Sequence, residues 1–312
     1  MKSLASDNYK SLGVDIRPPG TGAMRGWSYA ECDILDAEKL RSTVTDFAPE
    51  VVVHLAARTD IDGENVAAYS ANVEGTRNLV AAVAAAGTVR RVLFASSQLV
   101  CRVGYVPRND TDYCPVNPYG ESKVLSENIV RENMPKTITW CLLRPTTIWG
   151  EGMSSHYQRF LGHLQAGRYF HLSRGPLFKS YGYVGNTVYQ IMKFMNTDSR
   201  QIHAKTFYLS DYEPLSLTTW INGLAQALGT APPRSVPVVV ARFLGMGGDI
   251  LNWMGLKTFP LNSYRVRNIL TEYIFDMEET ERICGALPFT IDQGVSRTVR
   301  WFKELRAQEA KK

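Results

Sequence analysis

A tyrosine and a lysine four residues apart carry the clearest chemical signal in this sequence. They are Tyr119 and Lys123, in the run Tyr-Gly-Glu-Ser-Lys. A free phenol titrates near ~10, too high for efficient proton exchange at neutral pH, whereas a nearby ammonium group favours the phenolate and lowers that pKa. We therefore expect Tyr119 to act as a general acid and base whose pKa is tuned by Lys123.

The residues just before this pair predict a helix that presents it. Asn117 is a good N-cap and Pro118 suits the first helical position, so Tyr119 falls in the first turn. A spacing of i to i+4 puts both side chains on one helix face. We expect the helix to run to about Glu132. The alternative is an ordinary solvated helix face, because tyrosine and lysine are common residues.

A second motif lies upstream, where residues 91–97 form a short apolar run that ends in Ser96 and Ser97. The run predicts a buried parallel strand. Ligands of open α/β sheets collect at the carboxyl ends of such strands. A serine there could hydrogen-bond a substrate hydroxyl and hold it against Tyr119; the alternative is that the serines only open a loop.

Composition limits the classes of function. The 312 residues are 45% hydrophobic and 21% charged, which is typical of a globular protein with one large or two modest domains. The net charge of +5 is mild and the basic residues are scattered, so nothing supports nucleic-acid binding. Five cysteines without a C-x-x-C pair favour reduced thiols in the cytoplasm over disulfides or a zinc site, and we expect no bound metal.

Two segments bear on membranes. The N-terminal residues lack the pattern of a secretory signal. The most apolar late segment, residues 236–256, is interrupted by Arg242, Asp249 and glycines, so we expect no transmembrane helix. We interpret it as core helices of a substrate-binding lobe, with a peripheral membrane contact as the alternative.

Strand-like and helix-like segments alternate through the first half of the chain, which predicts an α/β fold with a doubly wound, Rossmann-type parallel sheet. We assign residues 1–150 to this cofactor-binding domain. Residues 151–312 are assigned mainly to a smaller substrate lobe, with some segments returning to the sheet. The elements expected in the first half are strands at 12–16, 51–55, 91–97 and 137–143, and helices at 37–47, 64–86 and 118–132.

Taken in order, these motifs resemble the extended short-chain dehydrogenase/reductase family, the group of NAD-dependent epimerases, dehydratases and reductases. The resemblance runs from residue 12 to the C-terminus. Each motif alone is weak, but the ordered set is specific: Gly13-Val-Asp15, Cys32-Asp33-Ile34, His54-Leu-Ala-Ala57, Asn72-Val-Glu-Gly-Thr76, Ser96-Ser97, Tyr119 to Lys123 and Leu143-Arg-Pro145.

The resemblance implies a catalytic site made by Ser97, Tyr119 and Lys123, with Ser97 also touching the substrate. It implies NAD as the cofactor, because a carboxylate at Asp15 would bind the adenosine ribose and repel the 2′-phosphate of NADP. Arg265 and Arg267 could meet the phosphates of the substrate, as a similarly placed arginine does in sugar-nucleotide relatives, although a surface helix with two solvated cations is an equal alternative. The remaining cofactor contacts implied are Asp33, Ile34, Leu55, Ala56, Ala57, Lys123, Pro145 and Thr146.

The family pattern begins with a strand, a glycine-rich turn and a helix, which hold the pyrophosphate. Here Met1 to Lys10 contain no glycine, and Gly20, Gly22 and Gly26 follow Asp15 with the wrong spacing. We therefore expect that the first βα unit is missing and that this chain binds NAD weakly or not at all. The neighbours of the missing strand should then expose apolar edges.

The leading functional hypothesis is an NAD-dependent epimerase or oxidoreductase acting on a hydroxyl of a nucleotide sugar. Gln98 and Leu99 stand where dehydratases of the family carry two acids, so dehydration is not expected. One alternative is a hydroxysteroid-dehydrogenase-like enzyme, suggested by the apolar residues 236–256. The other is a non-catalytic or truncated family member. A cytoplasmic homodimer is expected from the resemblance.

Overall fold

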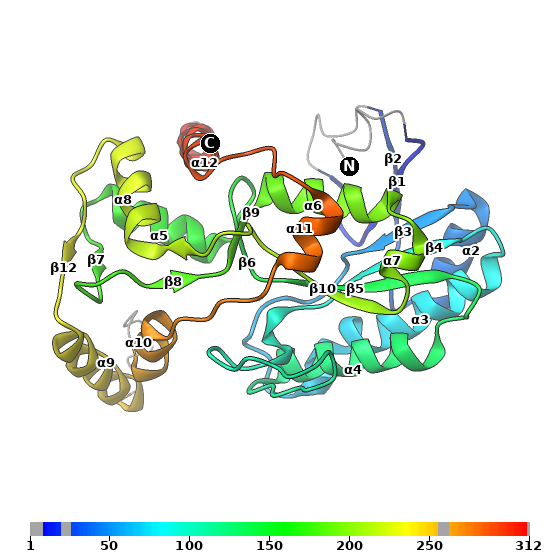
Figure 1. The fold of residues 1–312 in the computed structure, drawn as a ribbon, viewed down its shortest axis with the longest axis horizontal. Helices are drawn as coiled ribbons and strands as arrows, with labels where there is room; N and C mark the ends of the chain where they lie inside the picture. The colour runs from blue at the N-terminus through cyan, green and yellow to red at the C-terminus, as the bar shows by residue number, and fades with distance from the viewer. Residues whose placement is uncertain (1–8, 20–25, 255–261, 311–312) are drawn as a thin grey trace. The chain divides into compact units, whose positions relative to one another are not determined.

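The computed structural model describes residues 9–19, 26–254 and 262–310, and the chain divides into two compact units (Figure 1). The first unit holds the chain up to Arg102, together with residues 107–145 and 190–208. The second holds residues 103–106, 146–189 and the chain from Leu209 onward. The main change of unit thus lies between Pro145 and Thr146, whereas the sequence placed it at residue 150.

The first unit contains two sheets (Figure 1). A two-stranded sheet pairs β1 with β2, and a four-stranded sheet has the order β10-β5-β4-β3, in which β3, β4 and β5 are parallel. This confirms the predicted α/β class. The strands are β1 (Leu12–Asp15), β2 (Ser28–Glu31), β3 (Val51–His54), β4 (Arg91–Ala95), β5 (Thr139–Pro145) and β10 (Lys205–Leu209).

Helices connect these strands, and local sequence explains their limits. Helix α2 begins where Asp36 accepts a hydrogen bond from the amide of Lys39 at 3.0 Å, and it buries Leu40 and Val44, which are four residues apart. The other elements of the unit are the short helices η1 (Val66–Tyr69), η2 (Gln98–Val100) and α7 (Ser199–Ile202), and the helices α2 (Ala37–Phe47), α3 (Ser70–Ala86) and α4 (Pro118–Asn133).

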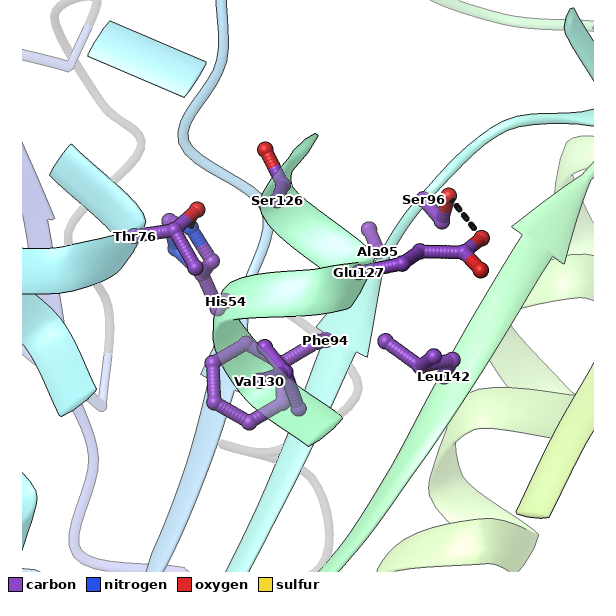
Figure 2. A pocket seen from close by; sticks show the side chains of 9 residues that line it. All are labelled: His54, Thr76, Phe94, Ala95, Ser96, Ser126, Glu127, Val130 and Leu142. Carbon is purple, nitrogen blue, oxygen red and sulfur yellow. Dashed lines mark hydrogen bonds between the residues drawn. The ribbon is translucent and has the colours of Figure 1, made fainter. Parts of the chain in front are cut away.

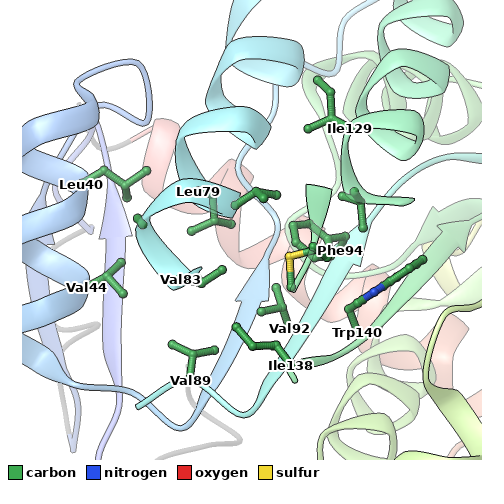
Figure 3. Packing of buried hydrophobic residues seen from close by; sticks show 14 of the residues in the cluster. Leu40, Val44, Leu79, Val83, Val89, Val92, Phe94, Ile129, Ile138 and Trp140 are labelled. Atoms are coloured by element: carbon green, nitrogen blue, oxygen red, sulfur yellow. The ribbon is translucent and has the colours of Figure 1, made fainter. Parts of the chain in front are cut away.

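One apolar core joins the helices to the four-stranded sheet (Figure 3). Leu79 and Val83 of α3 and Ile129 of α4 pack there against Val92 and Phe94 of β4. Burial of such side chains is the main source of stability in a unit of this kind. It also holds the carboxyl ends of the strands in place, where the site residues lie.

Strands β1 and β3 each pair on one side only within the described residues. The valines Val51, Val52 and Val53 of β3 are half-buried, whereas Val92, Leu93 and Phe94 of β4 are buried. The missing βα unit itself stays a prediction, because residues 1–8 and the glycines at 20 and 22 lie outside the described residues.

The second unit combines short strands with helices. Its apolar core includes Trp149, Tyr183, Trp220, Leu224 and Phe302. Helix α6 runs from this unit into the first one. The elements are β6 (Thr147–Trp149), α5 (Ser155–Gln165), β7 (Phe170–His171), β8 (Phe178–Lys179), β9 (Tyr181–Tyr183), α6 (Val184–Asn196), β11 (Leu215–Ser216), α8 (Leu217–Leu228), β12 (Arg234–Ser235), α9 (Val238–Trp253), α10 (Ser263–Leu270), α11 (Glu278–Cys284) and α12 (Ile291–Glu309).

The expected core role of residues 236–256 is only partly right. Helix α9 forms there, but it buries only Ala241, Gly245 and Gly248, and most of its large apolar side chains are exposed. Residues 255–256 lie outside the described part. Among the described residues, we find no helix with the length and apolar character needed to cross a membrane. All five cysteines are free thiols.

Candidate active site

Helix α4 starts as its sequence predicts. The side chain of Asn117 accepts a hydrogen bond from the amide of Gly120 at 2.7 Å, and Pro118 is the first helical residue. Tyr119 therefore lies in the first turn, and both Tyr119 and Lys123 are buried. The alternative of a solvated helix face is wrong for this pair.

A close approach of two backbones brings the serine to the tyrosine. Ser97 caps the turn η2 by accepting a hydrogen bond from the amide of Leu99 at 3.1 Å. A Cβ atom added at Gly120 would clash with the carbonyl oxygen of Leu99, so only glycine allows α4 to lie this close to the turn. The side chains of Ser97 and Tyr119 form a hydrogen bond across this contact.

Lys123 is directed toward the end of strand β4. Its Nζ donates a hydrogen bond to the carbonyl oxygen of Ala95 at 2.6 Å. Burial lowers the pKa of Lys123 from 10.5 to about 8, although the nearby carboxylate of Glu127 acts in the opposite direction. The amine is therefore mostly charged at neutral pH and begins to lose its proton just above it.

The pKa of Tyr119 shifts in the direction opposite to the one expected from sequence. Burial raises it above 10.0, and the hydrogen bond with Ser97 only partly offsets that rise. The ring of Tyr69, 5.9 Å away between centroids, is part of the surroundings that exclude water. The reason for the difference is that burial outweighs the other effects on the phenol, while the Lys123 ammonium bonds a backbone carbonyl. In this structure Tyr119 is a protonated phenol.

A buried charged network supports this site, and none of the sequence motifs predicted it. Glu127 of α4 accepts hydrogen bonds from Arg144 Nε at 2.9 Å and Nη2 at 2.8 Å, and another from the Tyr113 hydroxyl at 2.8 Å. It also accepts one from the Ser96 hydroxyl at 2.5 Å, as Figure 2 shows. Glu127 and Arg144 are almost fully buried. The network thus ties α4 to the ends of β4 and β5 beside Ser97.

A signal for this network was present in the sequence. Arg144 interrupts the apolar strand 139–145, and an arginine in a buried strand needs a carboxylate partner. What the sequence does not reveal is which acid faces it. In the sequence, nothing distinguishes Glu127 from other acidic residues on helices. Only the packing of α4 against β5 places its side chain beside that of Arg144.

A small cavity lies beneath the network (Figure 2). Its volume of about 10 Å³ is at the lower limit for one water molecule, so it is too small for a cofactor. His54 lines it, with Nε2 lying 3.4 Å from the Thr76 hydroxyl. Burial, aided by the charge of Lys123, lowers the pKa of His54 to about 3, so this histidine is neutral at physiological pH.

Apart from Lys123 of α4, the residues assigned to the cofactor by resemblance lie at or just beyond strand ends. Asp15 ends β1, and its Oδ1 accepts a hydrogen bond from the amide of Arg17 at 3.0 Å. Asp33 follows β2 and caps the next turn by accepting from the amide of Leu35 at 2.9 Å. The other positions are Ile34 after β2, Leu55, Ala56 and Ala57 after β3, Pro145 at the end of β5 and Thr146 after it.

Ile34 and Leu55 differ in their surroundings. Ile34 packs on helix α3 at Gly75, where an added Cβ would come within 2.6 Å of the Ile34 side chain. Leu55 is 59% exposed although it directly follows a strand of the sheet. An exposed leucine at the carboxyl end of a parallel strand is in the right place to contact a ligand.

Two of the assigned residues belong to the second unit. The amide of Thr146 donates to the carbonyl oxygen of Leu209 at 3.0 Å, and its hydroxyl donates to the same oxygen at 3.2 Å. Arg265 is an exposed residue of α10. The role of each toward a cofactor or substrate stays a prediction. Within the described part of the chain, no group of three or more His, Cys, Asp or Glu side chains could hold a metal ion.

Comparison with known proteins gives the family. The model of the 3-beta hydroxysteroid dehydrogenase/isomerase family matches residues 20–240. A curated relative from Escherichia coli O157:H7, N-acetyl-alpha-D-glucosaminyl-diphospho-ditrans,octacis-undecaprenol 4-epimerase, is 26% identical over 276 residues, which cover 86% of this chain and 82% of the relative. These matches confirm the predicted resemblance to extended short-chain dehydrogenases/reductases.

Solved structures share the fold. The UDP-glucose 4-epimerase of Thermotoga maritima, solved with UDP-glucose, has a TM-score of 0.72 at 19% identity and covers 98% of this chain and 94% of its own. The Bordetella bronchiseptica enzyme WbmH, solved with NAD⁺, has a TM-score of 0.72 at 18% identity and covers 97% and 93%. The predicted Rossmann-type fold is therefore confirmed.

Proposed function

Because this chain belongs to the 3-beta hydroxysteroid dehydrogenase/isomerase family, whose members are NAD-dependent enzymes, we propose that it oxidises a secondary hydroxyl of a nucleotide sugar and acts as an epimerase. The observation that carries this proposal is the Ser97–Tyr119 hydrogen bond at the carboxyl end of β4, with Lys123 one helical turn further on. The similarity to sugar epimerases supports the choice of a sugar over other alcohols.

Several residues present in the structure fit NAD. The Asp15 carboxylate at the end of β1 suits ribose hydroxyls, and the exposed Leu55 suits a planar ring. Asp33 and Ile34 would hold the adenine, and Lys123 the nicotinamide ribose. Bound NAD supplies the acceptor and donor of hydride.

The proton chemistry belongs to Tyr119. As a protonated phenol, it can donate its proton to a substrate carbonyl oxygen and become a phenolate. In the reverse direction, the phenolate takes the proton of the substrate hydroxyl as the carbon-bound hydrogen leaves as hydride. The hydrogen bond with Ser97 favours the phenolate. Ser97 also orients the substrate oxygen toward the phenol.

Oxidation and re-reduction together give epimerisation. Loss of hydride converts the hydroxyl-bearing carbon into a planar ketone, and return of hydride to the opposite face inverts that carbon. The proton that Tyr119 accepted in the first half returns to the oxygen in the second half, so the enzyme ends in its starting state. Arg265 is proposed to meet the phosphates of the substrate, and the chain is proposed to work as a homodimer.

Tyr119→Phe tests the proposed proton transfer. The variant keeps the ring but loses the exchangeable proton, so we expect turnover of UDP-sugars to fall by about 10²–10⁴-fold. Binding of NAD, measured by calorimetry, should change little. Tyr169→Phe is the control, because Tyr169 is a half-buried tyrosine in the second unit whose ring packs on Phe160. Full activity of Tyr119→Phe would exclude Tyr119 as the acid and base.

A hydroxysteroid dehydrogenase is the second candidate. The match to the 3-beta hydroxysteroid dehydrogenase/isomerase family and the exposed apolar side chains of helix α9 favour it. The proton chemistry at Tyr119 would be the same, but the substrate would be apolar. A panel of UDP-sugars and 3β-hydroxysteroids with NAD separates the two, because Tyr119-dependent turnover of only one class identifies it. No NAD binding by the wild-type chain would instead favour the non-catalytic alternative.

A further inference from the structure

Helix α9 packs through its small residues. Ala241, Gly245 and Gly248 are its buried positions, and they recur at helical spacing on one face. A Cβ atom added at Gly245 would lie 3.1 Å from the Val266 side chain and 3.2 Å from the backbone of Ser263. The face of α9 that packs on α10 therefore carries the smallest side chains of the helix and buries little apolar surface.

The opposite face of α9 carries the large apolar side chains. Val239, Phe243, Met246 and Ile250 follow one another at intervals of three or four residues, so they form one stripe, which Trp253 and Met254 extend. Phe243 is 67% exposed and Trp253 is 88% exposed. Single exposed apolar residues are ordinary on protein surfaces, but a continuous stripe along a helix marks an interaction site.

The charges beside this stripe are mainly positive. Arg242 of α9 and Arg265 and Arg267 of α10 are exposed. The one acidic residue of these two helices is Asp249, whose Oδ1 accepts a hydrogen bond from the amide of Ser263 at 3.2 Å. A surface complementary to this face is thus apolar inside and negatively charged at its boundary.

We propose that α9 docks this chain on the surface of a lipid bilayer that contains anionic headgroups. An apolar stripe with tryptophan and phenylalanine, flanked by arginines, is the pattern of a helix that lies in the membrane interface. The 16 residues of α9 would extend for about 24 Å, less than the ~30 Å of a hydrocarbon core, so the helix lies along the surface and does not cross it. The aromatic side chains enter the headgroup boundary, and Arg242 and Arg267 meet lipid phosphates.

Vesicle flotation of the full chain tests this proposal. The probes are phosphatidylcholine vesicles with and without phosphatidylglycerol, in the absence of NAD and substrate. We expect the chain to float with the vesicles and to bind more strongly when phosphatidylglycerol is present. Replacing Phe243 and Trp253 together by serine should weaken binding by about tenfold or more, because two large apolar side chains no longer leave water.

Two controls separate lipid binding from other effects. Val106→Ser removes an apolar side chain that is 69% exposed but lies outside α9, so it should bind vesicles like the wild type. Arg242→Gln with Arg267→Gln should lose only the preference for phosphatidylglycerol. Because Phe243 and Trp253 are exposed, their replacement should leave the circular dichroism spectrum and the unfolding transition unchanged.

Other results would overturn the proposal. If the wild type does not float with either kind of vesicle, α9 does not dock on lipid. Light scattering gives the second outcome. If, in addition, the wild type is a dimer and the variant with both Phe243 and Trp253 replaced is a monomer, the stripe is an interface with a second copy of the chain. Neither result bears on the proposed reaction, because the assay contains no substrate and changes no residue of the Tyr119 site.

Discussion

Helix α4 buries polar side chains, whereas helix α9 exposes large apolar ones. In α4, Tyr119, Ser122, Lys123, Ser126 and Glu127 are all buried. In α9, the buried positions are an alanine and two glycines, and most of the bulky side chains are exposed. Each arrangement is the reverse of what stability alone would select, because buried polar groups need partners and exposed apolar groups gain nothing from folding.

The two helices differ in whether their unusual side chains have partners. Every buried polar group named in α4 has a partner within the same unit; for example, Ser122 accepts a hydrogen bond from Asn72 at 2.9 Å, and Ser126 donates to the Asn72 carbonyl oxygen at 2.7 Å. Among residues 9–19, 26–254 and 262–310, nothing covers the exposed apolar stripe of α9. The polar groups of α4 therefore find their partners within its own unit, whereas the apolar stripe of α9 is proposed to find its partner in a lipid surface.

The largest effect should follow from breaking the Glu127–Arg144 pair. Arg144→Met leaves the buried Glu127 carboxylate without its main partner, and we expect a loss of about 3–5 kcal/mol in the free energy of unfolding, measured with urea. Combining it with Glu127→Leu should restore much of that loss, because both charges are then gone.

A surface ion pair provides the control for that experiment. Arg41 pairs with Glu38 at 2.7 Å, but both side chains are mostly exposed, so Arg41→Met should cost less than about 0.5 kcal/mol. A loss below about 1 kcal/mol for Arg144→Met would mean that the polar groups of α4 are not held in a buried network, and the contrast between the two helices would disappear.

A second test uses the pH dependence of Lys123. Its pKa of about 8 in the folded chain lies below the 10.5 of the free side chain, so the folded state resists its protonation. Lys123→Met should therefore stabilise the fold by about 2 kcal/mol at pH 7, after allowing for the lost bond to Ala95, while abolishing the proposed catalysis.

The sign of this effect can be followed with pH. Between pH 8 and 10.5 the unfolded wild type binds more protons than the folded one at this position, so its stability gains as pH rises through that window. The difference in the free energy of unfolding between Lys123→Met and the wild type should therefore shrink between pH 8 and 10.5 and stay constant below pH 8. If this difference in the free energy of unfolding does not change between pH 7 and 10.5, Lys123 is not a buried charge.

The smallest effect concerns the packing face of α9. Gly245→Val places a branched side chain against Val266 and the backbone of Ser263, and we expect a loss of about 1–2 kcal/mol in thermal or urea unfolding. The same substitution at Gly247, where an added Cβ meets nothing within 4 Å, should change stability by less than about 0.5 kcal/mol. Equal losses at the two positions would contradict the assignment of Gly245 to the buried face.

Sequence reasoning succeeded where short-range signals decide the structure. Helix α2 has the limits predicted, and α4 begins at its predicted proline, because caps and apolar spacing act within a few residues. It failed for the acid that pairs with Arg144 and for the outward face of α9. Both depend on which distant segment packs against the element, and no local pattern contains that information.

The sequence by itself determined the family, the α/β class and the placement of Tyr119 and Lys123 on one helix, because periodicity, capping residues and ordered motifs are properties of neighbouring positions. The tertiary structure alone decided the ionisation of those two residues, the partner of Arg144 and the burial of the small face of α9. The physical reason is that desolvation and ion pairing depend on what surrounds a group in space, and those surroundings come from parts of the chain far apart in sequence.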